Sequence, residues 1–149
     1  MSQRPELIVI IPVYNEEEII AEVVQSWHVM LDGLNIPYEM HLYNDGSKDN
    51  TGELLDTIAL NLGKVFVHHQ ANKGHGPTIL QGYRAHGDAE WLFQTDSDNE
   101  MDPAFFQQLF KAAANIPDLS GRYDQRRRDP ESSIMEDKPI GHYTIILCQ

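Results

Sequence analysis

The run LIVII at residues 7–11 decides the fold. Its consecutive β-branched and leucine side chains leave no polar face, which is typical of a strand buried on both sides of a parallel sheet. Pro12 ends the run. Beyond it, Asn15 is expected to cap a helix, with Glu18 completing a capping box, and apolar positions from Ile19 to Leu31 form one helical stripe.

The same alternation of strand and helix continues along the chain. We expect further strands at residues 38–43, 64–68, 91–95 and 118–123, with helices that begin at Asp49 or Thr51, at Pro77, and at Pro103 after an Asp102 cap. Short connections and right-handed crossovers then predict an α/β fold, with a mostly parallel sheet between two helical layers. Residues 1–125 form the predicted domain, and residues 126–149 a polar, irregular tail.

Composition excludes several classes of function. No apolar run approaches the roughly 20 residues that span a bilayer. The net charge of −12 argues against nucleic-acid binding, which requires a basic face. A single cysteine, Cys148, excludes an intrachain disulfide and fits a reducing cytoplasm.

Polar loops follow four of the predicted strands, at residues 12–16, 44–47, 72–76 and 96–98. Ligands of open parallel sheets bind beyond the carboxyl ends of the strands, so we expect these loops to share one site. Asp96 and Asp98 are two residues apart, which places both carboxylates on one side of an extended segment, where they can share a hard cation. The alternative is an acidic surface loop or a helix-capping run.

Other motifs are weaker. Residues 45–56 mimic an EF-hand calcium loop but lack its glycine at position 6 and its final glutamate. The glycines around His75 form either a flexible turn or a diphosphate site in which Lys73 and Gly74 take part. The seven histidines show no ligand spacing on one helix, and most are expected at the surface or half-buried. The arginine-rich stretch is either solvated or phosphate-binding, with Arg122 the best candidate.

Three segments together resemble a known family: IVIIPVYNEEEII, YNDGSKDNTGELL and ANKGHGPTILQGYRAHGDAEWLFQTDSDNEMDP, in this order. They are similar to the family 2 glycosyltransferases with the GT-A fold, and most of all to the polyprenyl-phosphate sugar transferases of the dolichol-phosphate mannose type. The resemblance covers about residues 6–130. It does not extend into the stretch ESSIMEDKPIGHYTIILCQ, so the chain is expected to be C-terminally truncated.

The resemblance implies a role for each matching position. Asp45 would contact the base, whereas Asn44 stands where the family usually has another acid. Asp96 and Asp98 match the D-x-D motif, with Asp98 the more direct ligand of Mg²⁺ or Mn²⁺ and Glu100 a further metal ligand. Arg122 would hold phosphate near the donor, and the segment after the first strand would contact the nucleotide through Pro12, Tyr14 and Glu16.

The expected reaction is sugar transfer, with inversion, from a UDP- or GDP-linked donor. The expected acceptor is a polyprenyl phosphate, which needs no general base because its oxygens are already anionic. This chemistry would place the protein in the cytoplasm, at the inner face of the membrane. Two alternatives stay open: a truncated, non-catalytic domain that binds nucleotide-sugar, and a nucleotidylyltransferase, which is disfavoured because PVYNEEE stands where its glycine-rich loop belongs.

Overall fold

The structure is a computed structural model that describes residues 5–115 and 145–147. Its sheet has the strand order β3-β2-β1-β4-β5, and every neighbouring pair is parallel. The strands are β1 Leu7–Val13, β2 Tyr38–Asp45, β3 Val65–Gln70, β4 Trp91–Gln94 and β5 Ile145–Leu147. The helices are α1 Ile20–Asp32, α2 Thr51–Asn61, α3 His75–Ala85 and α4 Pro103–Ala114.

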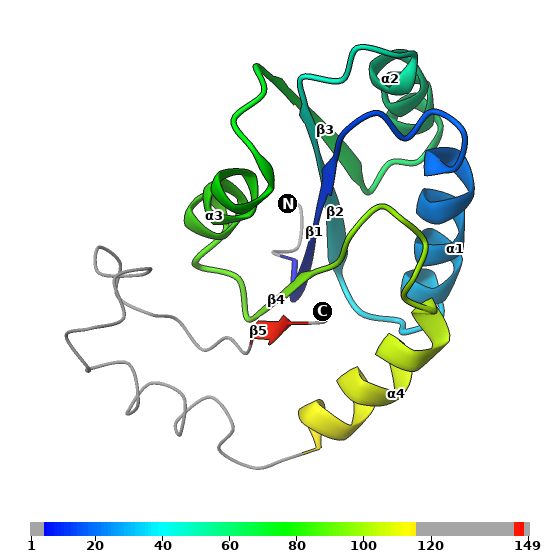
Figure 1. Ribbon diagram of the computed structural model, residues 1–149. Coiled ribbons are helices and arrows are strands. Elements are labelled where there is room, and N and C mark those ends of the chain that lie inside the picture. The colour runs from blue at the N-terminus through cyan, green and yellow to red at the C-terminus, as the bar shows by residue number, and fades with distance from the viewer. Residues whose placement is uncertain (1–4, 116–144, 148–149) are drawn as a thin grey trace, which may run out of the picture.

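Two apolar cores lie on the two faces of β1, which is buried along its whole length. Leu7, Val9, Ile11 and Val13 belong to the larger core, on the side of α1, α2 and α4. Ile8 and Ile10 alternate with them and belong to a smaller core under α3. Figure 1 shows α3 alone on its side of the sheet and the other three helices opposite. The predicted three-layer architecture and the mostly parallel sheet are therefore confirmed.

Aromatic rings fix α1 and α4 to the sheet. Phe106 of α4 lies 4.2 Å, centroid to centroid, from Phe93 of β4, and Trp27 of α1 lies 5.5 Å from the same ring. All three side chains are at most 1 % exposed. This packing fixes where β4 ends and α4 begins, and so it places the acidic loop between them.

Two of the four predicted helix starts are wrong. The α1 helix begins at Ile20 with no side-chain cap, because Asn15 adopts a positive φ of 51° and its Oδ1 accepts a hydrogen bond from the Lys48 N–H instead. The predicted capping box with Glu18 is therefore absent. Pro77 is the third residue of α3 rather than the first, since the helix starts directly after Gly74. The other two starts are confirmed: α2 begins at Thr51, and Asp102 caps α4 by accepting from the Ala104 N–H at 2.9 Å, with Pro103 following.

The last strand differs from the sequence prediction. The apolar stub near the C-terminus was assigned to an irregular tail, yet Ile145–Leu147 forms β5 and pairs in parallel with β4. A three-residue apolar run gives no periodicity from which to recognise a strand. The strand predicted at 118–123 lies outside the described residues, as does Arg122, and the division at residue 125 stays a prediction. No helix in the described part is long and apolar enough to cross a membrane.

Candidate functional site

The four loops do meet at the carboxyl edge of the sheet, around a pocket of about 380 Å³. Most of the residues proposed from the sequence line it together. Lys73 and Glu100, although described, are not among the lining residues. The lining consists of Pro12, Val13, Tyr14, Glu16, Asp45, Asn72, Gly74, His75, Asp96, Ser97 and Asp98.

The loops after β1 and β2 are tied to each other by backbone-to-side-chain hydrogen bonds. The Asn15 N–H donates to Ser47 Oγ at 3.0 Å, and the Glu16 N–H donates to Thr51 Oγ1 at 2.9 Å. Thr51 is fully buried, so this anchor is protected from water. The Tyr14 side chain, directly before these two anchored residues, remains 44 % exposed, which leaves its ring available to a ligand at the pocket.

Asp45 organises the glycine loop. Its carboxylate accepts hydrogen bonds from the N–H groups of Lys73 and Gly74 at 2.9 and 3.0 Å and from Gln70 Nε2 at 3.1 Å. Burial acts to raise the pKa of this carboxyl, but the hydrogen bonds outweigh it and hold the pKa below its usual value. Asp45 is therefore an anion at neutral pH whose acceptor sites are largely occupied by its own chain. The Lys73 ammonium donates to Gln81 Oε1 instead of facing the pocket.

The acidic loop presents two carboxylates with different surroundings. Asp96 Oδ1 accepts from Gln94 Nε2 at 2.9 Å and lies 3.3 Å from His75 Nε2. Asp98 Oδ1 accepts from the Glu100 N–H at 3.1 Å and is otherwise exposed. Across the pocket, burial and then the charge of Asp98 raise the pKa of Glu16, despite a hydrogen bond from Ser97. Glu16 and Asp98 thus repel each other, as two carboxylates do when no cation lies between them.

The pocket suits a cation better than a bare anion. Among the described residues that line it are four acids, Glu16, Asp45, Asp96 and Asp98, and no lysine or arginine. Carboxylate oxygens are the ligands that Mg²⁺ and Mn²⁺ prefer. Among the described residues, however, the ligand atoms of Asp96, Asp98 and Glu100 do not form a group of three within 4.8 Å of one another. A cation here would complete its coordination with water or with oxygens of a bound phosphate.

A second polar cluster, of three histidines, lies away from this pocket. Within the described ranges, the only three possible metal-ligand atoms closer than 4.8 Å to one another come from His41, His68 and His86. Burial lowers the pKa of each, to about 4 for His41 and His86. The sequence analysis missed this group because its members come from β2, β3 and the end of α3. It also missed His75 and Asn72 as pocket residues, although both lie in the glycine loop already singled out.

Comparison with known proteins identifies relatives for most of the chain. The sequence model of glycosyl transferase family 2 matches residues 8–144. An undecaprenyl-phosphate 4-deoxy-4-formamido-L-arabinose transferase from Edwardsiella ictaluri is 30% identical over 123 residues, covering 81% of this chain and 38% of that protein. The Pseudomonas paraeruginosa protein of the same name is 32% identical over 124 residues, covering 81% and 36%. The chain therefore spans little more than a third of these relatives.

Solved structures share the fold at lower identity. Staphylococcus aureus TarS 1-349 in complex with UDP-GlcNAc superposes with a TM-score of 0.60 at 21% identity, over 73% of this chain and 31% of that one. A mannosyltransferase from Pyrobaculum calidifontis, in complex with GDP-Man and Mn²⁺, gives a TM-score of 0.53 at 22% identity, over 65% and 28%. Both similarities confirm the expected glycosyltransferase fold.

Proposed function

Because the chain belongs to glycosyl transferase family 2, we propose that its pocket binds the nucleotide-diphosphate sugar of a glycosyl transfer reaction. The observation that carries this proposal is the meeting of four loops around an acidic pocket at the carboxyl edge of a parallel sheet. Ligands of such sheets bind at this edge. Solved proteins of the same fold hold UDP-GlcNAc, or GDP-Man with Mn²⁺, which supports a UDP- or GDP-linked donor.

The nucleotide half of the donor would lie along the loops after β1 and β2. Pro12 and Tyr14 line the pocket, and the exposed Tyr14 ring can pack against a base or ribose. Asp45 also lines the pocket and would contact the base, although hydrogen bonds from its own chain already occupy most of its acceptor positions. Its main task is to hold the Gly74 backbone at the pocket. We assign Lys73 no direct contact, because its side chain is bound to Gln81.

The diphosphate half would lie near the acidic loop, bridged by Mg²⁺ or Mn²⁺. Asp98 is exposed and faces the charge of Glu16, so we propose it as the principal cation ligand, with Asp96 as the second. Glu100 does not line the pocket and would act through its backbone N–H, which fixes the Asp98 carboxylate. When bound, the cation supplies charge neutralisation for the leaving diphosphate. Arg122 remains a proposed phosphate contact, and inversion the proposed stereochemistry.

The proposed acceptor is a polyprenyl phosphate. This assignment is supported by the relatives, which are named as undecaprenyl-phosphate transferases. A phosphate acceptor arrives as an anion and attacks without a general base. A polyprenyl-phosphate acceptor would place the reaction at the cytoplasmic face of the membrane. Since the chain covers little more than a third of those relatives, acceptor binding is proposed for the protein as a whole.

Calorimetric titration of UDP and GDP, in Mn²⁺ or Mg²⁺ and again in excess EDTA, tests the donor site. We expect clearly tighter binding with the cation, because the acids of the pocket repel a bare diphosphate. Equal affinity in both buffers would remove the cation from the proposal. A transfer assay with undecaprenyl phosphate separates an enzyme from the binding-only alternative, which predicts nucleotide binding without turnover.

A further inference from the structure

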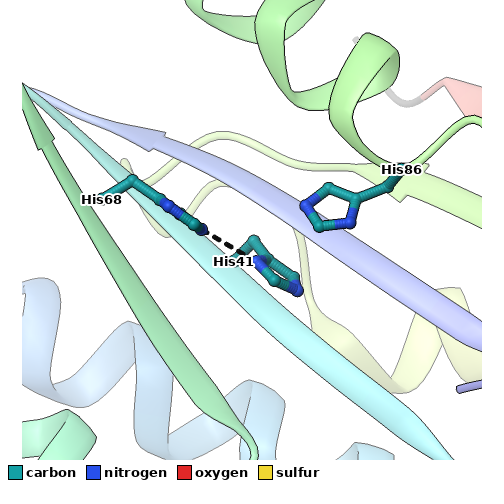
Figure 2. Close-up of side chains that lie close together, drawn as sticks. All are labelled: His41, His68 and His86. Carbon is teal, nitrogen blue, oxygen red and sulfur yellow. Dashed lines mark hydrogen bonds between the residues drawn. The ribbon is translucent and has the colours of Figure 1, made fainter.

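We propose that His41, His68 and His86 form a binding site for Zn²⁺, separate from the acidic pocket and independent of the proposed function. Figure 2 shows the three rings gathered between β2, β3 and the end of α3. One nitrogen from each ring lies within 4.8 Å of one from every other. Tetrahedral Zn²⁺ with Zn–N bonds near 2.0–2.1 Å needs nitrogens about 3.3 Å apart, so small side-chain adjustments would close the site.

The three residues come together through the sheet and not through a local motif. His41 of β2 and His68 of β3 are on adjacent parallel strands. His86 follows the last turn of α3, and its ring centroid lies 3.9 Å from that of His41. His41 precedes Asp45 by four residues, or about 13 Å along the strand, so the histidines cannot share a cation with the carboxyl-edge pocket.

The hydrogen bonds of His41 are those of a metal ligand. Its Nε2 lies 2.9 Å from Glu39 Oε2, and its Nδ1 lies 2.9 Å from His68 Nε2. A carboxylate that accepts from one ring nitrogen fixes the tautomer and leaves the lone pair on the other, which is how ligating histidines are commonly held. With Nε2–H given to Glu39, His41 Nδ1 is an acceptor that points at His68.

Metal binding at this pair requires only a change of tautomer. Without metal, His68 Nε2–H must donate to His41 Nδ1. With Zn²⁺ bound, the His68 proton would move to Nδ1, and both facing nitrogens would offer lone pairs to the ion. No net proton is released, because both imidazoles are neutral before and after. The ion would take the place that the shared proton holds in the free protein.

Ring stacking holds the site in place before an ion arrives. The His41 ring stacks on Phe66 at 5.1 Å, and the His68 ring stacks on Tyr43 at 4.5 Å. His41 is buried, whereas His68 and His86 are half-buried, so an ion can reach the cluster from their side. Three imidazoles and no carboxylate among the ligands favour Zn²⁺ over Mg²⁺ or Mn²⁺. A fourth position would be left for water.

Titration of the EDTA-treated 149-residue chain with ZnCl₂, and with CoCl₂ as a spectroscopic probe, tests the site. The background is Asp96→Asn/Asp98→Asn, which removes the acidic loop as a competitor. We expect one tightly bound Zn²⁺ per chain, a rise in Tm on adding Zn²⁺, and the intense visible absorption of tetrahedral Co²⁺. Loss of a residue that hydrogen-bonds a ligating histidine typically weakens metal binding about 10- to 100-fold. His68→Gln and His86→Gln each remove a ligand itself, so each should weaken Zn²⁺ binding by more than this.

The matched control is His69→Gln, next to His68 on β3. His69 Nδ1 pairs with Asn44 and its Nε2 lies 2.7 Å from Asp56, so it belongs to the opposite face of the sheet. This variant should keep full Zn²⁺ affinity, while Glu39→Ala should lose about 10- to 100-fold. Far-UV circular dichroism checks that each variant folds. If His68→Gln does not fold, His86→Gln, which lies at the end of a helix, provides the test. Equal Zn²⁺ affinity in the Asp96→Asn/Asp98→Asn background and in the same background carrying folded His86→Gln or Glu39→Ala would overturn the site and leave an aromatic packing cluster.

Discussion

Asp45 and Gly74 are 29 residues apart in the chain, yet the Gly74 N–H donates to Asp45 Oδ2 at 3.0 Å. The other carboxylate oxygen accepts from the neighbouring Lys73 N–H. The end of β2 therefore fixes the start of α3, and through it one wall of the pocket. Asp45, which the sequence predicts to contact a ligand, therefore also anchors the loop that forms this wall of the pocket.

Asp45→Asn should destabilise the fold. Asparagine keeps one acceptor oxygen but puts an NH₂ group against one of the two backbone N–H donors, so a partly buried donor loses its partner. The expected loss is about 1–3 kcal/mol in the free energy of unfolding, measured in urea. Asp98→Asn is the matched control on the same pocket: its side chain is exposed, and its stability should stay equal or rise slightly.

The same carboxyl should contribute to acid sensitivity. Its pKa is lower in the folded chain than its usual value near 3.9, so the folded state holds its proton less readily than the unfolded state. The stability it contributes is present above the unfolded pKa and is lost as pH falls through the lower folded pKa. The difference in unfolding free energy between wild type and Asp45→Asn should therefore shrink below about pH 4. A difference independent of pH down to acid unfolding would contradict this linkage.

Gly46 should not tolerate a side chain. It follows Asp45 at a φ of +71°, and a Cβ there would lie 2.6 Å from the Asn72 backbone nitrogen. Gly46→Ala should cost at least about 1–2 kcal/mol of stability from the backbone conformation alone, with the contact adding to it. Gly63→Ala provides the control, since a Cβ there meets nothing within 4 Å and its φ is not in the left-handed region. Denaturant unfolding should show that the two variants change the free energy of unfolding in opposite directions or by very unequal amounts.

Neighbouring phenylalanines of α4 offer a test of the larger core. Phe106 is fully buried against Phe93 and Trp27, whereas Phe105 is 52 % exposed. Phe106→Ala should cost about 3–5 kcal/mol, because it removes a large buried ring and leaves a cavity. Phe105→Ala should change stability by less than about 1 kcal/mol. Similar losses from both would mean that α4 does not pack as described.

The sequence predicted the fold well because its signals are local. A continuous, β-branched-rich apolar run such as residues 7–11 is typical of a strand covered on both faces, and the helical stripe of α1 has a clear period. The convergence of the four loops follows from parallel strands alone. Helix starts were less predictable, because Asn15 had two possible partners and the loop after β2 offered the better one.

The histidine cluster could not be found from spacing. His41 and His68 meet because β2 and β3 are neighbours in one register, and His86 joins them where α3 ends. None of these relations is local in sequence. The position of the Lys73 side chain could not be predicted for a similar reason: the loop was predicted correctly, but the ammonium donates to Gln81, eight residues further along the chain.

Asp98→Asn should separate ligand binding from folding. The substitution preserves volume and removes the charge that faces Glu16, so nucleotide binding that depends on Mn²⁺ or Mg²⁺ should fall steeply while the ligand-free Tm stays equal or rises. Calorimetry with UDP and GDP, with and without Mn²⁺, measures the first effect and a thermal melt the second. Residual binding in EDTA should be the same as or stronger than in wild type, since one repelling charge is gone.

Glu100→Gln is the control that shows which carboxylates the cation-dependent nucleotide binding requires. It removes a charge from the same loop but from a side chain outside the pocket lining, and it keeps the N–H that fixes Asp98. If cation binding depends on carboxylates that face the pocket, Glu100→Gln should retain most of the Mn²⁺-dependent affinity that Asp98→Asn loses. Equal losses from the two variants would show that the loop attracts the cation through its overall charge, and Asp98 would then have no distinct role as a ligand.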